Sequence, residues 1–161
     1  MHVSHMRGPV FHQAFGELSE ALQVARPRAV VLCTPPDMHI PQALLALQHG
    51  CHVLTEKPLS DGLSGVAELI AARDAAKRVV MVALCFRFHA GAVRARELLQ
   101  QGVIGELVGC RGMMGEPFPL IRPDDYRTMF TGRKGGTGAF DLIHDIDLAC
   151  WVSCAQVRAN S

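Results

Sequence analysis

Three short apolar runs of the sequence end in residues that are unusual at such a position. The run 51–54 leads into Glu-Lys-Pro at 56–58, the run 29–33 into Thr-Pro-Pro at 34–36, and the run 79–84 is followed closely by Arg87. If the runs are parallel strands, their carboxyl ends lie side by side, where ligands bind in open α/β sheets. We therefore expect one crevice, in which Lys57 can stabilise negative charge developing on an oxygen. The alternative is a surface lysine that closes a turn.

A second group of polar residues lies near the end of the sequence. Asp141, His144 and Asp147 are spaced by three, so on a helix they share one face. A histidine beside a carboxylate can be held in one tautomer and can take up a proton in a reaction. The alternative is a helix face with hydrogen bonds between i and i+3 and no catalytic role.

The pattern of the first part of the chain predicts β-α-β-α-β with short connections. The strands are apolar on both faces, as in a parallel sheet covered by helices, and right-handed crossovers then give a small, three-stranded, doubly wound α/β sheet. Asp37 is expected to cap the second helix. The predicted helices are 15–24, 38–49 and 63–77, and the predicted strands are 29–33, 51–55 and 79–84.

The character of the sequence changes after Arg87. A helix over 91–101 and a strand over 107–114 are predicted, followed by a loop with three prolines. A glycine-rich turn at 135–138 then leads into a helix over 140–152. We therefore place a domain boundary between residues 86 and 87.

Composition excludes several classes of function. Sixteen basic and fifteen acidic residues give no electrostatic reason to expect nucleic acid or a membrane surface as partner. The longest apolar run, 79–86, is far shorter than the about 20 residues that span a bilayer, and the N-terminus has no signal-peptide pattern. We expect a cytoplasmic protein.

The six cysteines form no Cys-x-x-Cys pair, so buried structural thiols such as Cys33, Cys51 and Cys85 are expected rather than disulfides or a metal site.

The order of these motifs resembles that of the Gfo/Idh/MocA family of NAD(P)-dependent oxidoreductases, over roughly residues 12–155. The resemblance implies a partial Rossmann-like domain over 1–86 that lacks its first strands. It implies the beginning of a C-terminal α+β substrate and dimerisation domain over 87–161. It also implies NAD or NADP as cofactor, a small-molecule substrate, and a homo-oligomer in the full-length form.

The resemblance further implies roles for single residues. Lys57 would stand against the reacting hydroxyl or carbonyl, and His144 would exchange the substrate proton with Asp141 as its acidic partner. Many members place the acidic residue four positions before the histidine rather than three, and carry a polar residue where Cys85 stands here. The implied cofactor contacts come from the strand ends: Thr34, Pro35, Pro36, His39, Glu56, Lys57 and Arg87.

One expected motif is missing. Nothing upstream of Ala29 matches Gly-x-Gly-x-x-Gly, the turn that lets the backbone approach a pyrophosphate. The sequence therefore predicts an enzyme truncated at both ends. Two functions remain open: an NAD(P)-dependent oxidoreductase acting on a sugar, polyol or related small carbonyl compound, and a non-catalytic truncated paralogue or remnant that binds a related subunit. A third interpretation is an unrelated α/β protein that uses the crevice for another ligand.

Overall fold

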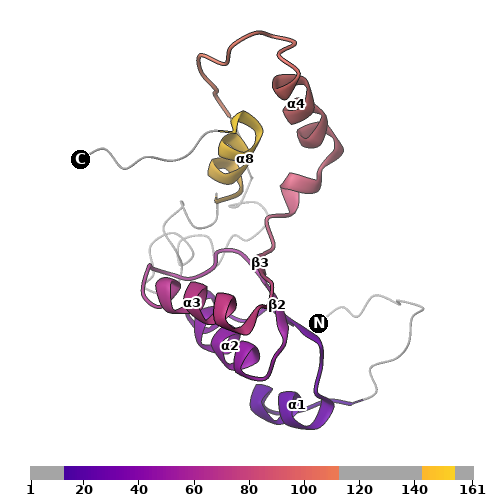
Figure 1. Cartoon of the computed structure of the whole chain (residues 1–161), viewed down its shortest axis with the longest axis vertical. Coiled ribbons are helices and arrows are strands. Elements are labelled where there is room, and N and C mark those ends of the chain that lie inside the picture. Colours follow the sequence, from indigo (N-terminus) through magenta and orange to yellow (C-terminus); the bar gives the residue numbers. More distant parts are fainter. Residues whose placement is uncertain (1–12, 113–142, 155–161) are drawn as a thin grey trace, which may run out of the picture.

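A computed structural model of the chain describes residues 13–112 and 143–154 (Figure 1). Its first part is a three-stranded parallel sheet in the order β1-β2-β3, and a helix connects each strand to the next. The predicted β-α-β-α-β arrangement is therefore confirmed. The strands are β1 (Ala29–Leu32), β2 (His52–Thr55) and β3 (Val80–Val82), and the first three helices are α1 (Leu18–Ala25), α2 (Pro36–Gln48) and α3 (Val66–Ala76).

The start of α2 differs from the prediction. Asp37 makes no capping hydrogen bond; the helix begins at Pro36, with Pro35 as the residue before it. Proline suits the first helical position because its φ angle is already helical and that position needs no N–H donor. Asp37 lies instead in the first turn, where its negative charge interacts favourably with the positive end of the helix dipole.

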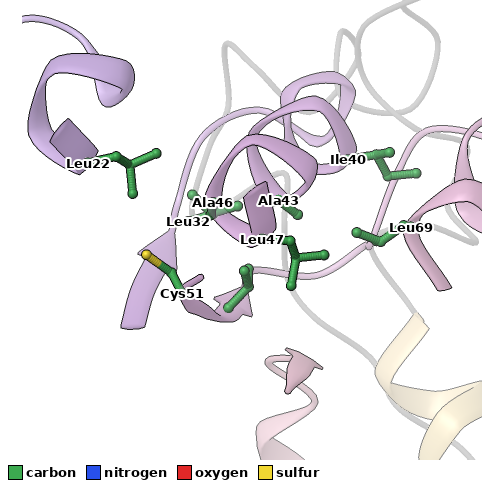
Figure 2. Close-up of a cluster of buried hydrophobic side chains, with 9 residues drawn as sticks. Leu22, Leu32, Ile40, Ala43, Ala46, Leu47, Cys51 and Leu69 are labelled. Carbon is green, nitrogen blue, oxygen red and sulfur yellow. The ribbon is translucent and has the colours of Figure 1, made fainter. Parts of the chain in front are cut away.

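The hydrophobic core lies between the sheet and the helices α1, α2 and α3 (Figure 2). Helix α2 contributes the largest share, and α2 and α3 contact each other, so they cover the same face of the sheet. The buried apolar residues are Leu22, Leu32, Ile40, Ala43, Ala46, Leu47, Cys51, Val53 and Leu69.

The opposite face of the sheet is exposed in the part of the chain that the structure describes. Val31, Leu54 and Met81 lie in register across the three strands and are 66%, 36% and 40% exposed. The sequence predicted apolar strands covered on both faces. Within residues 13–112 and 143–154, the helices supply that cover on one face only.

After β3 the chain enters a helical region. A 3₁₀ helix η1 (Cys85–Phe88) leads into α4 (Ala90–Gln100), which packs against η1 and against α8 (Ile143–Ser153) (Figure 1). The Arg96 guanidinium lies 4.4 Å from the centre of the Trp151 ring, a cation–π contact between α4 and α8. The helix predicted over 91–101 is confirmed, as is the described part of the helix predicted over 140–152.

Two further expectations from the sequence are wrong. Residues 107–112 form no strand; the Val108 side chain is 98% exposed, and these residues have no neighbouring strand in the described chain to satisfy a ladder. The rest of the predicted strand, 113–114, lies outside the described residues.

The expected burial of the thiols is confirmed for Cys51, whereas Cys33 and Cys85 are exposed.

None of the helices described in residues 13–112 and 143–154 combines the length and the apolar character needed to cross a membrane.

Candidate active site

The parallel sheet places the three polar segments at neighbouring strand ends. Glu56 donates its backbone N–H to the Leu32 carbonyl at 2.8 Å, and Ala83 donates to the Thr55 carbonyl at 2.8 Å. The chain following β2 therefore leaves the sheet between the chains that follow β1 and β3. The topology needed for a crevice at this edge is present.

Lys57 lies on the wall of a cavity of about 580 Å³ beside that edge. The volume is within the range typical of small-molecule sites. The wall is mainly apolar and comes from the segment between β2 and α3, the end of β3, and α8. The Lys57 side chain is half-buried, its backbone N–H donates to the Glu56 carboxylate at 3.1 Å, and the Lys57–Pro58 peptide bond is cis. The lining residues are Lys57, Pro58, Leu59, Ser60, Gly62, Leu63, Val66, Val82, Leu84, Ile143, Ile146, Asp147 and Cys150.

Asp147 brings a carboxylate to the same cavity and is held by Arg87. The Arg87 Nε donates to Asp147 Oδ2 at 2.8 Å, and a second Arg87 nitrogen donates to Oδ1. The Asp147 side chain is 13% exposed and the Arg87 side chain 40%. The hydrogen bond to Asp147 raises the pKa of Arg87; burial opposes this shift and the charge of Asp147 adds to it. The pair joins η1 to α8 at a residue that lines the same cavity as Lys57.

Arg87 was expected from the resemblance to contact the cofactor, and this expectation stays a prediction. Among the described residues, its guanidinium is engaged with Asp147, and Arg87 is absent from the cavity wall. The sequence pattern indicates Asp147 only as a member of the helix face and does not mark it as a site residue. Its spacing of three from His144 was the signal that could have identified it, since this spacing brings it one turn along the same face.

His144 lies near the start of the described part of α8. Its ring centre is 4.6 Å from that of Phe86, and its Nδ1 is buried with no hydrogen-bond partner in the described chain. The cavity wall includes its neighbour Ile143 but not His144 itself. The structure therefore brings Lys57 together with Asp147 on one cavity and leaves His144 beside it. Asp141 lies outside the described residues.

The segment after β1 is held by side-chain hydrogen bonds. Thr34 Oγ1 donates to Gln42 Oε1 at 2.7 Å. The His39 ring is 1% exposed, and its two nitrogens lie 2.7 Å from the Thr34 carbonyl oxygen and 2.9 Å from the Pro58 carbonyl oxygen. Both ring nitrogens are therefore engaged by backbone, and neither is directed to a ligand in this conformation. Pro35 is exposed and Pro36 half-buried, so their surfaces remain open to a cofactor.

A parallel α/β sheet with a ligand-sized cavity at the carboxyl ends of its strands is the arrangement in which Rossmann-like proteins bind nucleotides. Comparison with known proteins agrees. Residues 6–84 match the model of the Gfo/Idh/MocA oxidoreductase family, which has an NAD-binding Rossmann fold. The chain is 30% identical over 148 residues to inositol 2-dehydrogenase of Corynebacterium glutamicum, over 90% of this chain and 41% of that protein.

Two solved structures are also similar. Apo scyllo-inositol dehydrogenase from Lactobacillus casei matches with a TM-score of 0.74 and 25% identity, over 87% of this chain and 40% of that one. An inositol dehydrogenase homologue from Azotobacter vinelandii, solved with NADH and myo-inositol, matches with a TM-score of 0.50 and 33% identity, over 55% and 25% of the two chains. The chain belongs to the Gfo/Idh/MocA family of oxidoreductases. It spans less than half the length of the first curated relatives it matches, 42%, 32% and 32%.

The cofactor of this family is NAD or NADP, and the described residues fit one end of it. The apolar cavity wall suits an uncharged, planar ring such as reduced nicotinamide, and Lys57 and Asp147 add polar groups at its edge. The pyrophosphate end has no such match, because the sequence contains no Gly-x-Gly-x-x-Gly turn. The fit is therefore with the nicotinamide end.

Proposed function

We propose that this chain forms part of the active site of an NAD(P)-dependent dehydrogenase that acts on a hydroxyl group of a sugar or polyol, or on the related carbonyl. The observation that carries the proposal is Lys57 on the wall of a ligand-sized cavity at the carboxyl end of β2. The names of the relatives support the substrate class, because both the curated relative and the two solved structures are described as inositol dehydrogenases or a homologue.

The chemistry divides between the cofactor and the chain. When bound, the nicotinamide supplies hydride transfer. In the oxidative direction the C–H bond of the alcohol breaks with its electron pair, and the O–H proton leaves to a base. The Lys57 ammonium donates a hydrogen bond to the substrate oxygen and stabilises its developing negative charge. The apolar wall excludes water around that charge, which strengthens the interaction.

Two other residues complete the proposal. Asp147, oriented by its paired hydrogen bonds from Arg87, accepts a hydrogen bond from a neighbouring hydroxyl of the substrate. His144 takes up the proton, and its unpartnered Nδ1 among the described residues is consistent with a nitrogen kept for exchange. The role of Asp141 as the acidic partner of His144 stays a prediction.

Replacement of Lys57 tests this function. Lys57→Met removes the charge and keeps the length of the side chain, whereas Lys57→Arg keeps the charge. Lys77→Asn is the matched control, because Lys77 ends α3 away from the cavity at a φ of +52°, which asparagine tolerates. NAD(P)H absorbance is followed with myo-inositol and scyllo-inositol as substrates.

We expect Lys57→Met to lower kcat by about 10²–10³-fold, the effect of losing one electrostatic stabiliser, while the Kd of the cofactor changes little. Lys57→Arg should retain part of the activity, and Lys77→Asn all of it. Turnover in Lys57→Met equal to that of the unmodified chain would remove Lys57 from the mechanism.

The second candidate is a non-catalytic chain that binds a related full-length subunit. The missing phosphate-binding turn favours it. This candidate predicts no binding of NADH to the isolated chain and no turnover, together with a stable complex with a full-length relative in size-exclusion chromatography. Saturable NADH binding by the isolated chain would exclude it.

A further inference from the structure

His39 occupies an unusual place between two chain segments of the site. It lies in the first turns of α2, is 1% exposed, and contacts two backbone carbonyls through its two ring nitrogens. The His39 Nε2 is 2.7 Å from the Thr34 carbonyl oxygen, in the segment after β1. The His39 Nδ1 is 2.9 Å from the Pro58 carbonyl oxygen, in the segment after β2. The ring therefore joins the two strand-end segments on which the site is built.

The His39 ring connects the two segments just beyond the end of the β1–β2 hydrogen bonding. The Glu56 N–H reaches the Leu32 carbonyl at 2.8 Å, and beyond this bond the His39 ring bridges the two segments. Carbonyl oxygens only accept hydrogen bonds, so a neutral ring donates to one of them and an imidazolium ring donates to both. Burying so polar a ring is favourable only with such partners.

We propose that His39 is a positioning residue that fixes the backbone at Lys57 and Pro58, and through it the direction of the Lys57 side chain on the cavity wall. Pro58 is the next residue after Lys57, so a hydrogen bond to its carbonyl restrains the peptide that carries the lysine. The contact to Thr34 anchors the ring to β1. This inference rests on the proposed function of Lys57, and it replaces direct cofactor contact as the role of the His39 ring.

Two substitutions separate the two contacts. In His39→Asn the side-chain amide nitrogen reaches the position of Nδ1 and can still donate to the Pro58 carbonyl. In His39→Gln the amide nitrogen reaches the position of Nε2 and can donate to the Thr34 carbonyl instead. The matched controls are His49→Asn and His49→Gln, because His49 is an exposed histidine at the end of the same helix whose Nδ1 lies 3.0 Å from the Leu45 carbonyl.

Kinetics and nuclear magnetic resonance of the full chain provide the readouts. We expect His39→Gln to lower kcat by about 10–100-fold with little change in the KM of the cofactor, since displacement of a catalytic group by about 1 Å can have this effect. It should also shift the backbone amide resonances of Lys57 and Ser60. His39→Asn should retain most of kcat and leave these resonances near their original positions.

Two results would overturn the proposal. The first is an equal loss of kcat in the two variants with unchanged Lys57 and Ser60 resonances, which would make the ring part of the packing only. The second can be measured in the unmodified chain, so it holds even if neither variant folds. The proposal predicts a ring N–H proton of His39 that exchanges slowly with solvent and shows nuclear Overhauser contacts to Thr34 or Pro58. Absence of that proton signal would contradict the bridge between the two segments.

Failure of the proposed function gives a different result. If Lys57→Met keeps full turnover, Lys57 is not catalytic. The resonance shifts of Lys57 and Ser60 in His39→Gln but not in His39→Asn would still report that His39 positions the segment.

Discussion

Replacing Gly65 by alanine is expected to destabilise the chain by about 2–5 kcal/mol. Gly65 precedes α3 with a φ of +77°, a conformation that costs a residue with a Cβ about 1–2 kcal/mol. A Cβ at this position would also lie 2.9 Å from Cγ2 of Ile40. Ile40 is 6% exposed and packed in the core, so it cannot move aside freely, and overpacking adds about 1–3 kcal/mol.

Gly62→Ala is the matched control for this prediction. Gly62 lies in the same segment between β2 and α3, and an added Cβ there would meet no described atom within 4 Å. Its effect should stay within about 0.5 kcal/mol, as for most surface changes. Urea unfolding followed by circular dichroism gives both free energies of unfolding, provided the slope m is unchanged. A Gly65→Ala variant as stable as Gly62→Ala would refute the close approach of α2 to the start of α3.

Three further outcomes are expected for the free energy of unfolding. A double-mutant cycle with Arg87→Met and Asp147→Asn should give a coupling of about 1–2 kcal/mol, above that of exposed pairs because Asp147 is only 13% exposed; a coupling below about 0.3 kcal/mol would contradict the pairing. Leu47→Ala, at 3% exposed, should cost about 2–5 kcal/mol and Leu54→Ala, at 36% exposed, less than about 1 kcal/mol; equal costs would mean that the second face of the sheet is covered. Burial raises the pKa of the Cys51 thiol, and the positive charge of Arg78 lowers it by a smaller amount. As the pH rises, the thiol therefore loses its proton in the unfolded chain before it does so in the folded chain, and the free energy of unfolding should fall above about pH 8.5. Cys51→Ala should show a flatter profile by thermal denaturation over that range, and an unchanged slope would contradict this.

The order of elements could be predicted because it follows from local signals. Short apolar runs bounded by proline or glycine specify β1, β2 and β3, and the helical periodicity between them specifies the connections. The pattern places the start of α2 two residues too late, because Pro35 and Pro36 indicate the end of a strand, whereas Pro36 also begins the helix. The strand over 107–112 was predicted from β-forming residues, but β structure needs a partner for its hydrogen bonds.

The candidate site was only partly predictable for a similar reason. Lys57 could be placed at a strand end from its position next to Pro58, which favours extended backbone. The partners of Arg87 and His39 could not be predicted. Asp147 is 60 residues from Arg87 along the chain, and Pro58 is 19 residues from His39. Contacts of this kind depend on how elements pack, and a single sequence carries little information about them.

The most direct test of the site is titration of the ¹⁵N-labelled chain with NADH, monitored by nuclear magnetic resonance, beside the Lys57→Met variant. If the cavity beside Lys57 receives the nicotinamide, saturable shifts should concentrate on the amides of Lys57, Ser60 and Asp147, which line it, and should weaken in the variant. Shifts confined to residues away from the cavity, or no shifts at millimolar NADH, would contradict the assignment of this cavity as the nicotinamide site.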